Sequence, residues 1–319
     1  MYEFTRPGGL KDQIAECRRL ELTTDPNDYG DITRVNEYCR NVSETTTEVM
    51  ISTYENNTAH GWFDITHPSA DPFPPSYLVG FLNQHWVQAA LGVPVNHTAI
   101  SSAVYNAFQS TGDHTRQGML EHIASILSSG IKVHLMYGDR DYACNWLGGE
   151  ASSLKIPWEH QSDFAEAGYT PLVLSPVHSA GLTRQYGNLS FSRIYQAGHL
   201  VPSYQPEAAY EVFMRSLRNR DIATGTVDLG KVWEKGEEYA TWGPRDTWWM
   251  KSEVLPGPEP ECYVLMVGTC TEEQREWLRD GTAVVKDFIL IGRENGTESE
   301  SRTEKWRSAG EQIPLGLSE

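Results

Sequence analysis

The sequence contains no long apolar run and no excess of basic residues. Its most apolar stretches, around 263–267 and 288–291, fall far short of the roughly 20 residues that a bilayer-spanning helix needs. Lys and Arg number 26 against 43 Asp and Glu, which gives a formal net charge of -17 at pH 7. Such a chain is repelled by nucleic acid, because it cannot neutralise phosphates. We therefore predict a globular protein with no membrane span and no nucleic-acid partner.

Motifs for metals, redox chemistry and phosphates are also missing. The 10 histidines form no H-E-x-x-H pattern, and the 5 cysteines form no C-x-x-C pattern. No Gly-rich phosphate loop is present, and Gly148-Gly149 is more simply a turn. We expect no metal and no cofactor.

The first nine residues have neither the basic start nor the apolar segment of a signal peptide. Five Asn-x-Ser/Thr sequons nevertheless exceed what the composition gives by chance and indicate passage through the secretory pathway. They begin at Asn41, Asn56, Asn96, Asn188 and Asn295. We expect a secreted or vacuolar protein whose true N-terminus lies upstream, with a cytosolic protein as the alternative.

The cysteine count is odd. Cys17 with Cys39 and Cys262 with Cys270 are plausible local disulfides, which leaves Cys144 as a single thiol. In a cytosolic protein, all five would instead be unpaired thiols.

Hydrophobic periodicity predicts a mixed α/β sheet. Residues 1 to about 75 are polar and rich in proline near their end, which favours short helices and loops covering a core. Downstream, apolar spacing predicts helices and strands, with turns at Gly181 and Gly187-Asn188. The predicted helices cover 77–90, 119–127 and a segment after Pro206 whose apolar face is Ala209, Val212, Phe213 and Leu217. The predicted strands cover 131–137, 172–175 and 191–195, the last two as a strand pair.

Beyond about residue 221 the composition changes. A linker is predicted at 256–260 because of its prolines, and 298–311 is polar enough to be disordered. Tryptophans interleaved with charges favour packing anchors over a sugar or base platform. They are Trp233, Trp242, Trp248 and Trp249.

An acidic residue and a histidine each follow a predicted strand. Asp141 comes directly after the strand at 131–137, and His199 follows the strand at 191–195. Acid before histidine at two strand ends is the order of an α/β-hydrolase triad, in which the acid fixes the imidazole tautomer and the histidine takes a proton from a nucleophile. The pattern alone leaves open a turn-forming Asp141 and a structural His199 in the core.

The segments around these two residues resemble the serine carboxypeptidase family. Residues 141–146 (DYACNW) are similar to its D-[FY]-x-[CV]-N-[WY] segment, and 197–206 (AGHLVPSYQP) resembles the region of the family histidine in fungal members. Residues 86–93, 180–181 and 186–191 resemble further family segments in the same order. The resemblance covers roughly residues 5 to 220.

The resemblance implies the C-terminal portion of an α/β-hydrolase fold with a helical insertion and a C-terminal extension. Residues 1–75 would belong to the insertion or cap, 76–220 to the hydrolase core, and 221–319 to an extension that is partly disordered after about 296. It implies that Asp141 orients His199, the general base and acid of acyl transfer. It also implies substrate contacts for Asn145, for Leu200, and for Cys144 as a buried free thiol. Relatives carry a cysteine at the position of Leu10, so the pairing of Cys17 with Cys39 stays open.

The nucleophile motif of such hydrolases, G-x-S-x-G on a strand-to-helix turn, is absent. The only G-x-S is Gly316-Leu317-Ser318 at the end of the chain. In the family the nucleophile turn precedes the region matched here, so we expect an inactive fragment, missing the N-terminal half of the fold and exposing a sheet edge. The complete form would release C-terminal residues from peptide substrates. The alternatives are a pseudoenzyme that binds peptides or a partner, and an acyltransferase relative.

Overall fold

A computed structural model describes residues 2–26, 30–69, 78–98, 100–176, 178–250, 262–264, 267–286 and 289–294. Contacts divide the chain into two compact units, residues 1–69 with 100–257, and residues 70–99 with 258–319. These units follow other boundaries than the cap, core and extension, and that division stays a prediction. The predicted linker at 256–260 and the predicted disordered tail lie outside the described residues.

The first unit opens with three helices, α1 (Tyr2–Thr5), α2 (Leu10–Thr24) and α3 (Thr33–Thr58). The prediction of short helices was wrong for α3, which runs for 26 residues. Its buried positions Val35, Cys39 and Val42 recur at helical spacing, and Val35 and Cys39 of this narrow stripe pack with Cys17 of α2. Cys17 and Cys39 form a disulfide. A stripe of three residues in a polar helix was too sparse for the sequence pattern to reveal.

A small hairpin follows α3, where loops were predicted. Strands β1 (His60–Gly61) and β2 (Asp64–Pro68) pair antiparallel, with Gly61 opposite Asp64. The expectation that the first 75 residues contain no sheet was therefore wrong for this segment.

The main sheet has four strands in the order β3-β6-β5-β4. Strand β3 is parallel to β6, and the other two pairs are antiparallel. Gly181 lies inside β5 rather than in the predicted turn. A Cβ there would be 2.1 Å from the Arg193 carbonyl oxygen of β6, so the close approach of the two strands requires a glycine. Gly187-Asn188 does form the β5–β6 turn. The strands are β3 (Val133–Gly138), β4 (Thr170–Ser175), β5 (His178–Tyr186) and β6 (Leu189–Ile194).

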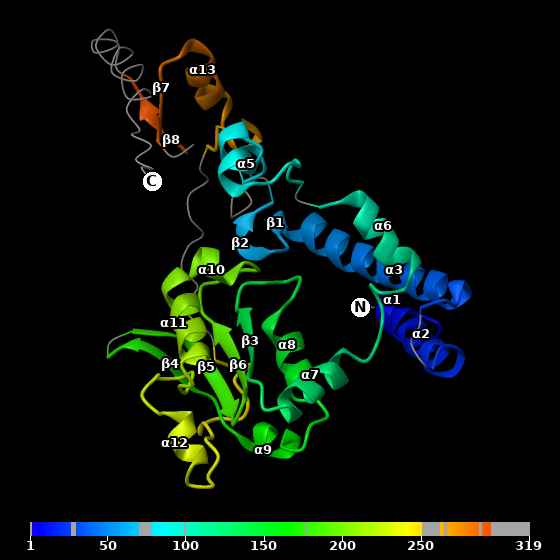
Figure 1. Cartoon of the computed structure of the whole chain (residues 1–319). Helices are drawn as coiled ribbons and strands as arrows, with labels where there is room; N and C mark the ends of the chain where they lie inside the picture. Colours follow the sequence, from blue (N-terminus) through cyan, green and yellow to red (C-terminus); the bar gives the residue numbers. More distant parts are fainter. Residues whose placement is uncertain are drawn as a thin grey trace. The chain divides into compact units, whose positions relative to one another are not determined.

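Helices cover both faces of this sheet (Figure 1). One core cluster joins α7 (Met119–Ser128), α8 (Trp146–Ser153) and α9 (Gln161–Glu166) to the sheet around Phe191. A second cluster joins α10 (Val201–Tyr204) and α11 (Pro206–Leu217) to the opposite face. Helices α6 (Ser102–Ser110) and α12 (Leu229–Trp233) complete the unit. Within the described residues β3 has a strand partner on one side only, so its other edge is unpaired.

The predicted apolar face of the helix after Pro206 is only partly buried. Ala209 and Val212 of α11 are buried, whereas Phe213 and Leu217 are 61% and 69% exposed. Trp233, Trp242, Trp248 and Trp249 are between 47% and 84% exposed, so the prediction that they are packing anchors was wrong. Residue type alone favours burial of large rings, but tertiary contacts decide it.

The second unit holds α4 (Leu78–Leu82), α5 (His85–Leu91), the 3-10 helix η1 (Val267–Thr269), α13 (Glu272–Asp280), β7 (Ala283–Lys286) and β8 (Ile289–Arg293). The single helix predicted at 77–90 is interrupted at Asn83, whose side-chain amide donates to the carbonyls of Val79 and His97. Such a bond competes with the helical backbone pattern. The Cys262–Cys270 disulfide packs with Leu290 of β8. No helix among the described residues is long and apolar enough to cross a membrane.

His134 makes the fold sensitive to acid. Its Nδ1 lies 2.8 Å from Ser190 Oγ, its Nε2 is buried, and burial lowers its pKa from 6.5 to about 4. A histidine neutral in the fold but protonated when unfolded contributes stability above pH 6.5, and that contribution is lost as the pH falls toward 4. We expect the His134→Asn variant to lose less stability between pH 7 and pH 4.5 than the wild type, as measured by urea unfolding at both pH values. Equal losses in both proteins would contradict this assignment.

Candidate active site

Asp141 lies in the loop that follows β3. Its side chain is 4% exposed, and its Oδ1 atom accepts a 3.1 Å hydrogen bond from the Cys144 amide. The loop is held against the second loop of the site, because the Arg140 amide donates to the Ala197 carbonyl at 2.9 Å. Gly138 at the end of β3 permits this approach, since a Cβ there would lie 2.3 Å from the Ala197 oxygen.

His199 lies in the loop that follows β6. Its Nδ1 atom donates to Asp141 Oδ2 at 2.8 Å across 58 positions of sequence. Its side chain is 35% exposed, so the imidazole combines a buried carboxylate on one side with access to solvent. An Nδ1 proton held by a carboxylate leaves Nε2 as the basic nitrogen, which is the tautomer that a general base requires.

A hairpin residue that sequence reasoning missed completes the surroundings of His199. The Phe63 ring lies against the imidazole, with ring centroids 4.7 Å apart, and the Phe63 carbonyl accepts from the His199 amide at 2.9 Å. Phe63 joins β1 to β2 in a segment of only nine residues. Such short strands leave almost no periodic signal in the sequence.

Cys144 is free but exposed, so the expectation of a buried thiol was wrong. Partial desolvation of the sulfur is the larger cause that raises the thiol pKa, and the negative charge of Asp141 is the second. We expect iodoacetamide to alkylate Cys144 slowly at pH 7 and faster at higher pH, because only the thiolate reacts. Asp141→Asn removes the charge and should move the rate profile to lower pH. Mass spectrometry of timed aliquots measures this, and an unmoved profile would contradict the electrostatic cause.

The other two predicted contact residues have different surroundings. Asn145 is the N-cap residue that precedes α8, with its Oδ1 accepting from the Gly148 amide at 3.0 Å and its side-chain amide donating to the Tyr142 carbonyl. The bond from the Gly148 amide caps the helix. Leu200 is 49% exposed beside His199. Their contact with substrate stays a prediction.

The sequons differ in exposure. Asn41, Asn56 and Asn96 are exposed, whereas Asn188 is half-buried and donates to the Gly130 carbonyl at 3.1 Å. Asn295 lies outside the described residues. Glycosylation at these positions stays a prediction.

Among the residues that the structure describes, two groups of side chains bring potential metal ligands together. Asp141, Cys144 and His199 offer ligand atoms within 4.8 Å of one another, as do Cys17, Glu21 and Cys39. The second group cannot supply thiolates, because its two sulfurs are bonded to each other. In the first group the raised thiol pKa disfavours the thiolate that a soft metal binds. The expectation of no metal stays a prediction.

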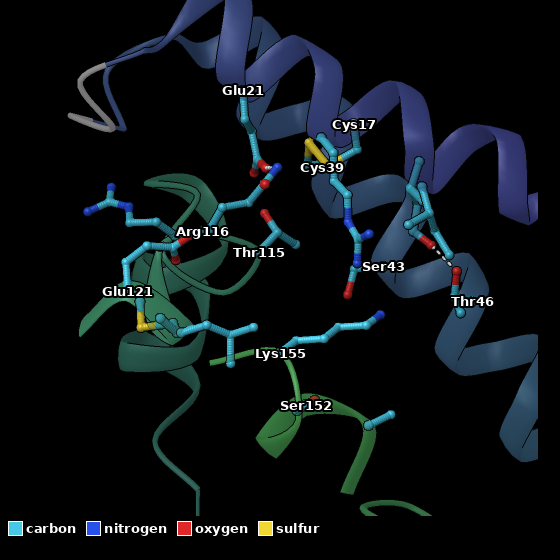
Figure 2. Close-up of a pocket in the computed structure, with 18 of the residues that line it drawn as sticks. Cys17, Glu21, Cys39, Ser43, Thr46, Thr115, Arg116, Glu121, Ser152 and Lys155 are labelled. Atoms are coloured by element: carbon cyan, nitrogen blue, oxygen red, sulfur yellow. Dashed lines mark hydrogen bonds between the residues drawn. A yellow bond between two sulfur atoms is a disulfide. The ribbon is translucent and has the colours of Figure 1, made fainter. Parts of the chain in front are cut away.

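A cavity of about 650 Å³ lies in the same unit but is lined by other residues. Figure 2 shows Glu21, the Cys17–Cys39 disulfide and Lys155 around it, and Gln117 donates to Glu21 on its wall. Neither Asp141 nor His199 lines this cavity. We therefore separate it from the candidate active site.

An acid and a histidine paired at two strand ends agree with a hydrolase, and comparison with known proteins decides the family. The model described as serine carboxypeptidase matches residues 8–219. The chain belongs to the serine carboxypeptidase family. The family match and the mixed sheet together support the predicted α/β-hydrolase fold.

Several fungal proteins are similar to this serine carboxypeptidase family member. Carboxypeptidase S1 homolog B of Arthroderma otae is 44% identical over 286 residues, which are 90% of this chain and 44% of that protein. The carboxypeptidase Y homolog of Arthroderma benhamiae is 38% identical over 297 residues, 91% of this chain and 46% of that protein. The chain thus spans less than half the length of these relatives.

A solved structure also matches this family member. It is that of a prohormone-processing carboxypeptidase from Saccharomyces cerevisiae, with 18% identity and a TM-score of 0.49 over 73% of this chain and 50% of that one.

Proposed function

We propose that this chain supplies the acid and the general base of a serine carboxypeptidase site that releases C-terminal residues from peptides. The observation that carries the proposal is the 2.8 Å hydrogen bond from His199 Nδ1 to the buried Asp141 Oδ2. Family membership supports the hydrolase chemistry. No observation favours a peptide-binding pseudoenzyme or an acyltransferase over this reading.

In the proposed reaction, His199 Nε2 takes the proton from a serine hydroxyl as its oxygen attacks the scissile carbonyl. Asp141 holds the imidazole tautomer and stabilises the imidazolium that forms. His199 then donates that proton to the leaving amine, and water releases the acyl group by the same steps in reverse order. Leu200, Cys144 and Asn145 are proposed to face the substrate beside the histidine.

We further propose that the serine comes from a segment outside this sequence, which holds no G-x-S-x-G motif. The complete protein is proposed to be secreted or vacuolar, in keeping with fungal relatives named carboxypeptidase S1 and carboxypeptidase Y homologs.

The purified chain tests the nucleophile proposal. Incubated with a blocked dipeptide and a fluorophosphonate probe, it should give no turnover and no covalent label, because without the serine the acyl-enzyme path is lost. A fungal serine carboxypeptidase treated in parallel is the positive control. Turnover together with labelling of one serine would overturn the proposal that the nucleophile lies elsewhere, and peptide mapping would identify that serine.

A further inference from the structure

The hairpin of β1 and β2 is bonded to the main chain of both site loops. The Trp62 carbonyl accepts from the amides of Tyr142 and Ala143 at 3.2 and 2.9 Å, directly after Asp141. The neighbouring Phe63 carbonyl accepts from the His199 amide at 2.9 Å. Two consecutive residues of one short segment therefore fix the backbone on both sides of the Asp141–His199 hydrogen bond.

The second strand of the hairpin extends this attachment. The Ile65 amide donates to the Arg140 carbonyl at 2.9 Å, and the Arg140 guanidinium donates to Thr66 Oγ1 at 3.4 Å. The Asp141 loop is thus bonded to the hairpin before and after the carboxylate. Shifting the hairpin would shift the loop as well, because moving the hairpin alone would break these backbone hydrogen bonds.

Asp64 lies at the centre of this arrangement and is 3% exposed. Its Oδ1 accepts from the amide and the hydroxyl of Thr66 at 2.8 and 2.7 Å. The Tyr204 hydroxyl also forms a hydrogen bond with the Asp64 side chain. Burial is the larger cause that raises the Tyr204 pKa, and the Asp64 charge is the second, so the phenol keeps its proton and is the donor. Tyr204 ends α10, which begins two residues after His199.

The hairpin and the His199 loop touch without any gap. A Cβ on Gly198 would lie 2.5 Å from the Phe63 oxygen and 2.7 Å from the Tyr204 hydroxyl. The residue before His199 is therefore enclosed by the hairpin on one side and by the phenol of Tyr204 on the other. Only a glycine fits between them.

We propose that Asp64 is a positioning residue for the active site: through Thr66 and Tyr204 it holds the β1–β2 hairpin as a clamp that keeps His199 in register with Asp141. The proposal rests on the proposed function, since it assigns Asp64 a role in the same acid–histidine pair. Asp64 touches no reacting atom. It acts through the loops that carry the pair, as supporting hydrogen bonds do in preorganised sites.

The test uses the full chain labelled with ¹⁵N-histidine and two substitutions, Asp64→Asn and Tyr204→Phe. Asp64→Asn keeps the shape and one acceptor oxygen but removes the negative charge and the second acceptor oxygen, so it cannot hold both Thr66 and Tyr204 as the carboxylate does. Tyr204→Phe removes only the hydroxyl. In the wild type we expect a far-downfield proton resonance from the His199 Nδ1–H that bonds to Asp141. Each variant should lose or broaden this resonance, and the amides of His199 and Ala143 should exchange with deuterium at least roughly tenfold faster.

Tyr239→Phe is the matched control, because Tyr239 is another phenol that donates to a buried carboxylate, Asp221, at 3.5 Å in the same unit. It should lower stability without changing the His199 resonance. If Asp64→Asn and Tyr204→Phe stay folded by urea unfolding and keep both the resonance and the slow exchange, the clamp is overturned while the proposed function stands. If the wild type itself lacks the resonance, the Asp141–His199 pair fails and both proposals fall.

Discussion

Replacing His199 with alanine should abolish peptidase activity once the chain is joined to a nucleophile. A fusion can supply it, by placing the nucleophile-bearing part of a fungal serine carboxypeptidase before this chain. Loss of the general base leaves the serine unactivated, so we expect kcat to fall about 10⁶-fold. Asp141→Asn, which leaves the wrong imidazole tautomer, should cost about 10⁴-fold. The measurement is hydrolysis of a blocked dipeptide.

The matched control for this substitution is His122→Ala. His122 is an exposed histidine on α7 and belongs to neither of the two loops that carry Asp141 and His199. Its loss should therefore change kcat by less than about threefold. Fluorophosphonate labelling of the fusion should follow the same order as turnover. A His199→Ala fusion that folds and retains activity within about tenfold of the parent would remove His199 from the mechanism.

The candidate pair could be predicted from the sequence because its residues lie at strand ends. Asp141 and His199 each follow a strand in which apolar residues alternate with other residues, and strands β3 and β6 are parallel neighbours, so their carboxyl ends meet at one edge. Local patterns sufficed to predict those two strands. Their pairing with each other was not predicted: the pattern indicated 172–175 as the partner of 191–195, and this was wrong, because β5 lies between β4 and β6.

The clamp around the pair could not be predicted from the sequence. Asp64 and Phe63 lie in a polar stretch in which β1 has two residues and β2 has five, too few for either periodicity to emerge. The contacts of the hairpin reach more than 70 positions along the chain: Ile65 and Thr66 bond to Arg140, Trp62 bonds to Tyr142, and Phe63 bonds to His199. Such pairings depend on tertiary structure, which no window of neighbouring residues contains.

Burial of aromatic residues was predicted unevenly for the same reason. Phe191 alternates with polar neighbours in a strand and is fully buried, as its pattern indicates. Phe213 fits the apolar stripe of α11 equally well but is 61% exposed, whereas Ala209 and Val212 of the same stripe are buried. Periodicity predicts which side of an element is apolar, and the partner surface decides how much of that side is covered.

Phe191 and Phe213 therefore form a matched pair for a stability measurement. Phe191 is 0% exposed in β6 and packs against Tyr137 and Tyr169, with ring centroids 5.6 and 6.4 Å away. Phe191→Ala removes this ring from the centre of the larger core cluster and leaves a cavity, so we expect the free energy of unfolding to fall by about 3–5 kcal/mol.

Phe213→Ala deletes the same atoms from an exposed site and should change the free energy of unfolding by about 0.5 kcal/mol or less. Urea unfolding followed by far-UV circular dichroism measures both variants, because Trp146 lies in the same core cluster as Phe191 and its fluorescence would respond to the substitution itself. Similar losses in the two variants would mean that the sheet core around Phe191 is not closed. In that case the strand ends that bring Asp141 to His199 would lack their rigid support, since β6 pairs with β3 along six residues from Leu189 to Ile194.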